Sequence, residues 1–198
     1  MSQVGICRST DGTTVAEVDL DDTTMTVAEI VGEARACGAA LVWAHGGDPS
    51  GSGMVPMPGY AHLRARDAMP GRPLPPVDAD AFGPLLARAY LGLWGHKWVD
   101  PTRRPPTDDS VVLCLQEGAE PIGLCRVWPR ERLVDQPGVV PEHREPRRNL
   151  RLLEAACALL GPGVVDVDTW GESPEVLEAF ASLGFTVTEQ QPGWELRL

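Results

Sequence analysis

Apolar residues recur along the chain with two different spacings, and each spacing predicts one type of element. Spacings of three and four residues predict helices over 25–37, 78–94, 146–160 and 173–184. Short continuous or alternating apolar runs predict strands over 4–9, 15–20, 39–44, 60–66, 111–116, 121–128, 131–140 and 164–169, with a terminal hairpin over 185–189 and 194–198. We therefore expect an α/β (α+β) fold.

Segments rich in Gly and Pro interrupt this pattern at 46–58 and 70–76, where we expect loops. They divide the chain into an N-terminal segment, 1–69, a proline-rich linker, 70–78, and a larger C-terminal domain, 79–198. The strand expected over 60–66 fits either side of this division.

The N-terminal segment is weakly similar to part of the C-terminal domain. Residues 27–60 align without a gap on residues 152–185, and both stretches have the predicted order helix, strand, loop. The identical pairs are Glu29–Glu154, Gly38–Gly163, Val42–Val167, Gly46–Gly171, Pro49–Pro174 and Gly59–Gly184. Chance similarity and a degraded, partial repeat are both open interpretations.

The formal net charge of −11 argues against extended contact with nucleic acid or with an anionic membrane. A local anion site is still compatible with the sequence, because arginines concentrate at positions 126, 130, 132, 144, 147, 148 and 151. The five cysteines are scattered and lack metal-ligand spacing, which predicts reduced core residues of a cytoplasmic protein without a metal site. No apolar stretch approaches the roughly 18 residues of a membrane span, so we expect no membrane partner.

Residues 139–154 join a short apolar segment to a basic loop and an amphipathic helix. Such a helix start presents backbone N–H groups and the positive end of the helix dipole to an anion. The stretch resembles the acyl-donor loop of the GNAT (GCN5-related N-acetyltransferase) family, V-x-P-E-x-[RQ]-G-x-G-x-[GA] followed by a helix. The matching residues are Val139, Pro141, Glu142, Arg144 and Leu152-Leu153-Glu154.

A second stretch carries the same resemblance. The strand expected over 164–169 precedes a helix that ends in Leu183-Gly184-Phe185, as in the family. The order of elements from about residue 60 onward also resembles a GNAT domain, and the N-terminal segment adds a resemblance to tandem GNAT proteins. The resemblance implies a GNAT fold, in which helices flank a mixed central sheet. It also implies an N-acyltransferase that uses acetyl-CoA or another acyl-CoA as donor and needs no metal.

The resemblance also implies which residues contact the donor. The backbone near Val139 and Val140 would hold the pantetheine arm and polarise the acyl carbonyl. Arginine side chains could replace backbone contacts to phosphate, because Glu145, Arg147 and Asn149 occupy the three glycine positions of the family loop. The resulting candidates for phosphate binding are Arg144, Arg147, Arg148 and Asn149.

Three interpretations of this altered loop are open. Coenzyme A could bind in an altered way, the donor could be another phosphate-bearing molecule such as an aminoacyl-tRNA, or the arginines could lie on a solvated face of a non-catalytic module. Phe180 is a second departure, since many family members have a tyrosine there whose hydroxyl protonates the departing thiolate. We expect Phe180 to be a core residue.

Two residues are candidates for accepting the proton of the attacking amine. Asp166 and Asp168 share one strand face, which the resemblance places beside the acceptor cleft, and Asp168 is the candidate there. His96 follows the helix that walls this cleft in the family, and histidine titrates near neutral pH. A solvent-facing strand end and a surface loop are the alternatives. The expected partner is a small-molecule amine, and a homodimer is left open.

Overall fold

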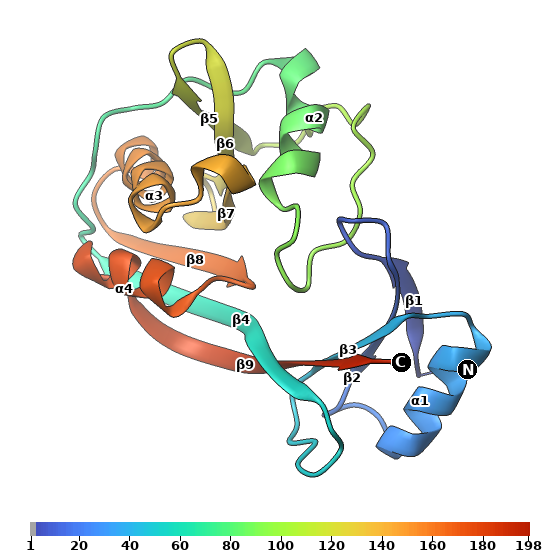
Figure 1. Cartoon of the computed structure of the whole chain (residues 1–198). Coiled ribbons are helices and arrows are strands. Elements are labelled where there is room, and N and C mark those ends of the chain that lie inside the picture. Colours follow the sequence, from blue (N-terminus) through green and yellow to red (C-terminus); the bar gives the residue numbers. More distant parts are fainter. Residues whose placement is uncertain (1–2) are drawn as a thin grey trace.

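The computed structural model describes residues 3–198, with the side chain of residue 136 excluded. Within these residues, four helices flank one nine-stranded mixed sheet of order β1-β2-β3-β9-β4-β8-β7-β6-β5 (Figure 1), so the predicted fold class is confirmed. The strands are β1 (Gly5–Arg8), β2 (Thr14–Asp19), β3 (Leu41–His45), β4 (Val55–Arg66), β5 (Val111–Glu117), β6 (Glu120–Trp128), β7 (Leu133–Val139), β8 (Val164–Trp170) and β9 (Thr186–Arg197). The helices are α1 (Val27–Ala36), α2 (Ala79–Ala89), α3 (Pro146–Leu160) and α4 (Pro174–Ser182), and a 3-10 turn, η1 (Pro141–His143), precedes α3.

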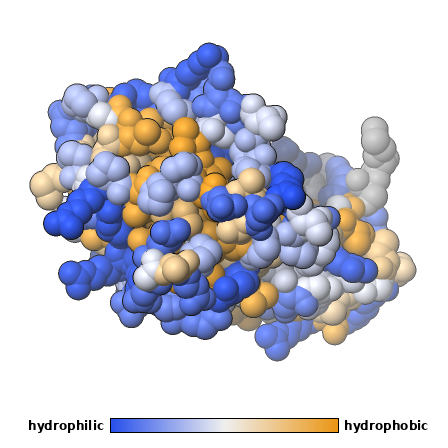
Figure 2. Space-filling view, turned by 90° about the horizontal axis from the view of Figure 1, so that it is seen from above, coloured by the Kyte–Doolittle hydropathy of each residue, from blue (hydrophilic) through white to orange (hydrophobic). Residues whose placement is uncertain are grey.

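Alternation along the strands places apolar side chains under the helices. Ile30 of α1 packs with Val42 of β3 in one buried cluster, and Leu152 of α3 packs with Val167 of β8 in another. Helix α2 packs on β6 and β7 from the face opposite α3 (Figure 1). Seen from the end where β5 and α2 lie, hydrophobic surface forms a band bordered by hydrophilic residues (Figure 2).

Two strand–helix–strand units with parallel strands occur in the sheet. In the N-terminal unit, β2, α1 and β3, residues 15–19 pair with residues 41–45. In the C-terminal unit, β7, α3 and β8, residues 133–135 pair with residues 166–168. Strand β9 pairs with both β3 and β4 and so connects the two parts of the sheet. The domain boundary at 70–78 and the internal repeat stay predictions.

Several predicted element boundaries were wrong. The terminal hairpin is instead the single strand β9, because residues 193–197 fill the space between β3 and β4 and pair with β3 throughout. The helix predicted over 78–94 ends at Ala89, and the chain then turns through Gly92, which has a φ of 74°. Strand β4 already begins at Val55, inside the predicted loop.

One cysteine also differs from the prediction that the cysteines are core residues: Cys37 is exposed.

Candidate functional site

Strands β7 and β8 separate after their three paired residues, and this separation opens the sheet. The pairing of β7 with its other neighbour, β6, has an irregularity between Leu124 and Arg126, and Pro137 removes one backbone donor from β7. The N–H of Val140 donates to the Ile122 carbonyl of β6 at 2.9 Å. Because donors alternate along a strand, the N–H of Val139 points the other way, toward the opening.

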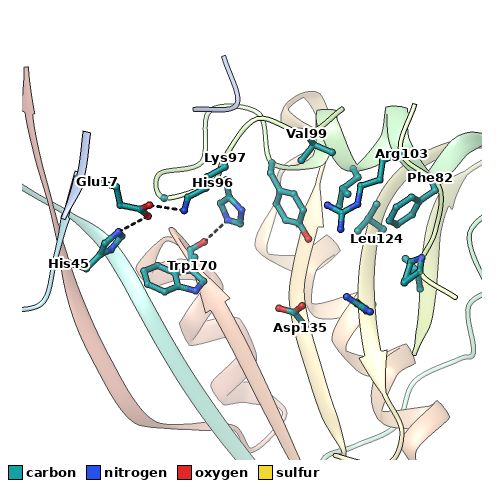
Figure 3. A pocket seen from close by; sticks show the side chains of 16 residues that line it. Glu17, His45, Phe82, His96, Lys97, Val99, Arg103, Leu124, Asp135 and Trp170 are labelled. Carbon is teal, nitrogen blue, oxygen red and sulfur yellow. Dashed lines mark hydrogen bonds and ion pairs between the residues drawn. The ribbon is translucent and has the colours of Figure 1, made fainter. Parts of the chain in front are cut away.

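A cavity of about 430 Å³ lies on the α2 side of the sheet. Both strand–helix–strand units contribute to it, as do α2 and the loop after α2 (Figure 3). We call it the acceptor cavity. Its lining residues are Glu17, His45, Phe82, Leu86, Tyr90, Gly95, His96, Lys97, Val99, Arg103, Pro106, Val112, Leu124, Arg126, Asp135 and Trp170.

Asp135 is the carboxylate of β7 in the acceptor cavity (Figure 3), and the sequence analysis did not single it out. It lies beside Asp168 of β8 and Arg126 of β6 in the strand pairing. Burial and the negative charge of Asp168 raise the pKa of Asp135 above its ordinary value. No hydrogen-bond donor for this carboxylate occurs in the described part of the chain. A carboxylate two residues before Pro137, in the predicted strand, was the available sequence signal.

Asp168, one of the two predicted proton acceptors, is not a lining residue of the acceptor cavity. Its Oδ1 accepts hydrogen bonds from the Tyr60 hydroxyl and from Nδ1 of His62, both at 2.7 Å. Asp166 likewise accepts two hydrogen bonds from Arg64, at 2.6 and 3.1 Å. These contacts join β8 to β4, so Asp168 acts on the cavity through its charge beside Asp135.

His96, the other candidate, lines the acceptor cavity and is only 7% exposed. Burial lowers its pKa to about 4, so the ring is neutral at physiological pH. A neutral ring donates from Nε2 to the Trp170 carbonyl of β8, 3.1 Å away. The ring also stacks on Tyr90, with ring centroids 4.4 Å apart. A histidine with this pKa is a weak base at neutral pH.

The Tyr90–His96 stack spans the opening between β7 and β8. On the β7 side, an added Cβ at Gly138 would lie 2.5 Å from the Tyr90 ring, so the ring packs directly on the glycine backbone. On the β8 side, His96 contacts the Trp170 carbonyl. Tyr90 and His96 line the acceptor cavity, whereas Leu93, between them in sequence, lines a second cavity. Segment 90–96 is thus the wall between the two cavities.

The second cavity, of about 150 Å³, lies at the starts of α3 and α4, and we call it the donor cavity. Val139, Arg144 and Asn149 line it. Arg144 donates from Nε to the Val139 carbonyl at 3.0 Å, and from NH2 to the carbonyls of Ala89 and Leu91 at 3.1 and 2.6 Å. Its guanidinium therefore holds the end of α2 against the loop that precedes α3.

Asn149 and Glu172 form a buried polar pair in the donor cavity, and they are 6% and 7% exposed. Nδ2 of Asn149 donates to both carboxylate oxygens of Glu172 at 3.2 and 3.3 Å. Burial raises the pKa of Glu172 to about 7, and Arg144 opposes this increase. Oδ1 of Asn149 is buried and has no hydrogen-bond donor in the described part of the chain.

Arg147 and Arg148 lie away from these residues, in a third cavity of about 470 Å³ that Arg151 and Leu115 also line. Arg147 is exposed, and Arg148 donates to Oε1 of Glu117 at 3.0 Å. The structure thus separates the predicted donor-binding residues into two groups. The buried Val139, Val140 and Asn149 and the half-buried Arg144 surround the opening, and the two outer arginines line the third cavity.

Three further expectations concern Phe180, a metal site and a membrane span. Phe180 is fully buried in the main core, as expected. Across residues 3–198, His, Cys, Asp and Glu side chains form no group of three or more arranged to hold a metal ion. None of the helices in this range combines the length and apolar character needed to cross a bilayer.

Comparison with known proteins identifies the fold. No family model and no curated protein matches the sequence. A GCN5-related N-acetyltransferase from Anabaena variabilis superposes with a TM-score of 0.54 at 11% identity, over 97% of this chain and 58% of that one. One from Kribbella flavida gives 0.50 at 13% identity, over 94% and 82%. A functionally unknown conserved protein from Staphylococcus epidermidis gives 0.50 at 11%, over 94% and 84%. The chain has the GNAT fold.

Proposed function

We propose that this protein is an N-acyltransferase that moves an acyl group from a phosphate-bearing donor, acyl-CoA in the first instance, to an amine of a small molecule. One observation carries the proposal: the opening between β7 and β8 lies between the acceptor and donor cavities. The Val139 N–H points into this opening, and the Asp135 carboxylate lies on its acceptor side.

The residues of the donor cavity fit the arm of such a donor. The buried Oδ1 of Asn149 requires a donor group, which an amide N–H of pantetheine could provide. Arg147 and Arg148 would contact the phosphates from the third cavity, while Arg144 keeps the loop in place. Entry of the arm between the two cavities requires the Tyr90–His96 stack to move.

The chemistry assigned to this chain has two parts. Asp135 accepts a proton from the ammonium form of the acceptor, and its raised pKa brings it closer to a match for that role at neutral pH. The amine nitrogen then forms a bond to the thioester carbonyl carbon and gives up its second proton to a water molecule as the carbon–sulfur bond breaks, and the same water passes a proton to the departing thiolate, so that an amide and a free thiol result. The Val139 N–H donates to the carbonyl oxygen as negative charge develops on it.

Binding of the donor is the first test. A saturable rise in melting temperature with acetyl-CoA and with free coenzyme A is expected, because a ligand that binds the folded state stabilises it. The double variant Arg147→Ala/Arg148→Ala should weaken this binding about tenfold or more. The matched control is Arg130→Ala, whose guanidinium pairs with Asp109 at 2.6 Å outside all three cavities. Equal affinity in the double variant would remove phosphate binding from these arginines.

A second candidate function is a non-catalytic binding module on the same fold. The observation that favours it is that the donor side is occupied by protein contacts: Arg144 is bound to three carbonyls, and Glu172 is buried beside it. Absence of any shift with acetyl-CoA, coenzyme A or an aminoacyl-tRNA would favour this module. A shift with aminoacyl-tRNA alone would identify the other type of donor.

A further inference from the structure

Three cationic side chains line the acceptor cavity, and two of them are already neutralised. Nζ of Lys97 lies 2.6 Å from the Glu17 carboxylate. Arg126 pairs with Asp108, donates to the Ser110 hydroxyl at 2.9 Å and lies over the ring of Trp128. The third cation is Arg103, whose guanidinium makes no hydrogen bond or ion pair within residues 3–198.

The backbone around Arg103 is held firmly enough to present this side chain to the cavity. An added Cβ at Gly83 of α2 would lie 2.2 Å from the Pro101 carbonyl oxygen and 2.6 Å from that of Arg103, so the loop packs directly on the helix backbone. The Arg103 N–H donates to the Asp100 carbonyl at 3.0 Å. The neighbouring Arg104 is directed elsewhere and pairs with Asp80 at the start of α2.

The wall near Arg103 is apolar. Phe82 of α2 and Leu124 of β6 lie beside the guanidinium, and Asp135 lies below them at the opening between the strands (Figure 3). The cavity therefore presents one cation and one carboxylate that no described residue pairs with, and an apolar surface. The complementary molecule has an amine, a carboxylate and an apolar side chain.

We propose that the acceptor is an α-amino acid with an apolar side chain. This proposal rests on the proposed acyltransferase function. The amine of the acceptor lies at Asp135, where it meets the acyl carbon, and its carboxylate forms a charge-assisted pair with the Arg103 guanidinium. The side chain contacts Phe82 and Leu124. Arg103 is then a specificity-determining residue, since it selects acceptors with a carboxylate.

The test is an acyl-transfer assay with acetyl-CoA and matched acceptors. L-leucine, L-methionine and L-phenylalanine are compared with their amides, which keep the amine and the side chain and lose the negative charge. The wild-type protein should use at least one of the acids with kcat/KM about tenfold or more above its amide. Arg103→Ala should raise KM for that acid at least tenfold, leave kcat nearly unchanged and leave the amide unaffected, and Arg103→Lys should restore part of the loss.

Arg104→Ala is the matched control, because it removes a loop arginine that lies outside the cavity and should change neither KM value. Equal use of acid and amide by the wild type, or equal losses on both in Arg103→Ala, would overturn the amino-acid proposal while leaving acyl transfer intact. If no amine is acylated, the proposed function fails. Calorimetric titration with the three amino acids and their amides then tests the carboxylate contact by itself, and binding that is insensitive to Arg103→Ala refutes it.

Discussion

The two strand–helix–strand units share one arrangement and differ in how far their parallel strands stay together. In the N-terminal unit, β2 and β3 pair along residues 15–19 and 41–45, whereas β7 and β8 pair only along residues 133–135 and 166–168. The units also place a carboxylate at matching positions. Glu17 of β2 pairs in register with Trp43 of β3, and Asp135 of β7 pairs with Asp168 of β8. The 125-residue offset of the sequence alignment relates Trp43 to Asp168, so Glu17 and Asp135 occupy matching positions.

The contacts of Glu17 and Asp135 differ because β7 and β8 separate whereas β2 and β3 do not. Glu17 accepts from His45 at 3.2 Å and from Lys97 at 2.6 Å, and these contacts lower its pKa to about 2. Asp135 has no such contact in the described residues, and burial beside Asp168 raises its pKa. In the N-terminal unit, β2 and β3 stay paired, and Glu17 is neutralised by Lys97 and His45, so this part of the sheet has no opening. Where the ladder is interrupted, between β7 and β8, the Val139 N–H points into the opening and the Asp135 carboxylate has no hydrogen-bond donor among the described residues.

The largest expected effect comes from exchanging these carboxylates for amides. Asp135→Asn should lower kcat for acyl transfer by about 100-fold or more, because it removes the proton acceptor and keeps the shape. Glu17→Gln should lower it by less than about threefold. Initial-rate kinetics at saturating acetyl-CoA measures both. A loss in Asp135→Asn smaller than that in Glu17→Gln would reverse the roles assigned to the two units.

The next effect concerns Gly46 and Gly171, which the same alignment relates and which have φ values of 68° and 71°. At Gly171, an added Cβ would meet the backbone oxygen of Trp94 at 2.5 Å, whereas at Gly46 it would meet the side-chain carboxylate of Asp21, which can rotate away. Gly171→Ala should therefore cost about 4 kcal/mol of unfolding free energy and Gly46→Ala about 1–2 kcal/mol. Urea denaturation of both variants measures the difference, and equal costs would contradict the argument.

A third effect is a pH dependence of the unfolding free energy that comes from Glu172, next to the C-terminal unit. The pKa of Glu172 is about 7 in the folded state against an ordinary value of 4.5, so the folded state binds the extra proton between these values. The unfolding free energy should then fall as pH rises through this window. Glu172→Gln should remove up to about 3 kcal/mol of this dependence and stabilise the protein at pH 8.

His96 acts in the opposite direction, because its lowered pKa of about 4 costs stability as pH falls below 6.5. The quantity to compare is therefore the difference between variant and wild-type unfolding free energies across pH 4 to 8. A difference independent of pH would mean that folding leaves the pKa of the Glu172 carboxyl at its ordinary value.

The smallest effect is at the helix starts. Thr26 caps α1 in a capping box with Glu29, whereas Glu145 precedes α3 without a side-chain capping bond. Thr26→Ala should cost about 1 kcal/mol, and Glu145→Ala should stay within about 0.5 kcal/mol of wild type. Thermal unfolding compares them. A larger cost for Glu145→Ala would show that this side chain supports the donor loop in another way.

The apolar periodicity determined helix α3 to the residue and the strands around it, because these elements bury one continuous face each, and the family resemblance supplied the mixed sheet. The motif around Val139 predicted the donor loop, which stays a prediction, and Asp166 and Asp168 of β8 lie on one face of their strand, where both contact β4. The sequence could not show that β9 is one strand, since β4 pairs with it over residues 186–195 and β3 over residues 193–197, and both partners come from distant parts of the chain.

The site itself was decided by tertiary structure. The position of Asp135 before Pro137 is a local signal, but it does not show that this carboxylate lacks a hydrogen-bond donor among the described residues whereas Tyr60 and His62 of β4 donate to Asp168. Nor does the sequence indicate that Arg144 is bound to three carbonyls while Arg103 has no partner among the described residues. Local pattern fixes which face a side chain takes, whereas partners from distant segments fix whether its charge is satisfied, and that second property selects the residues that can act on a ligand.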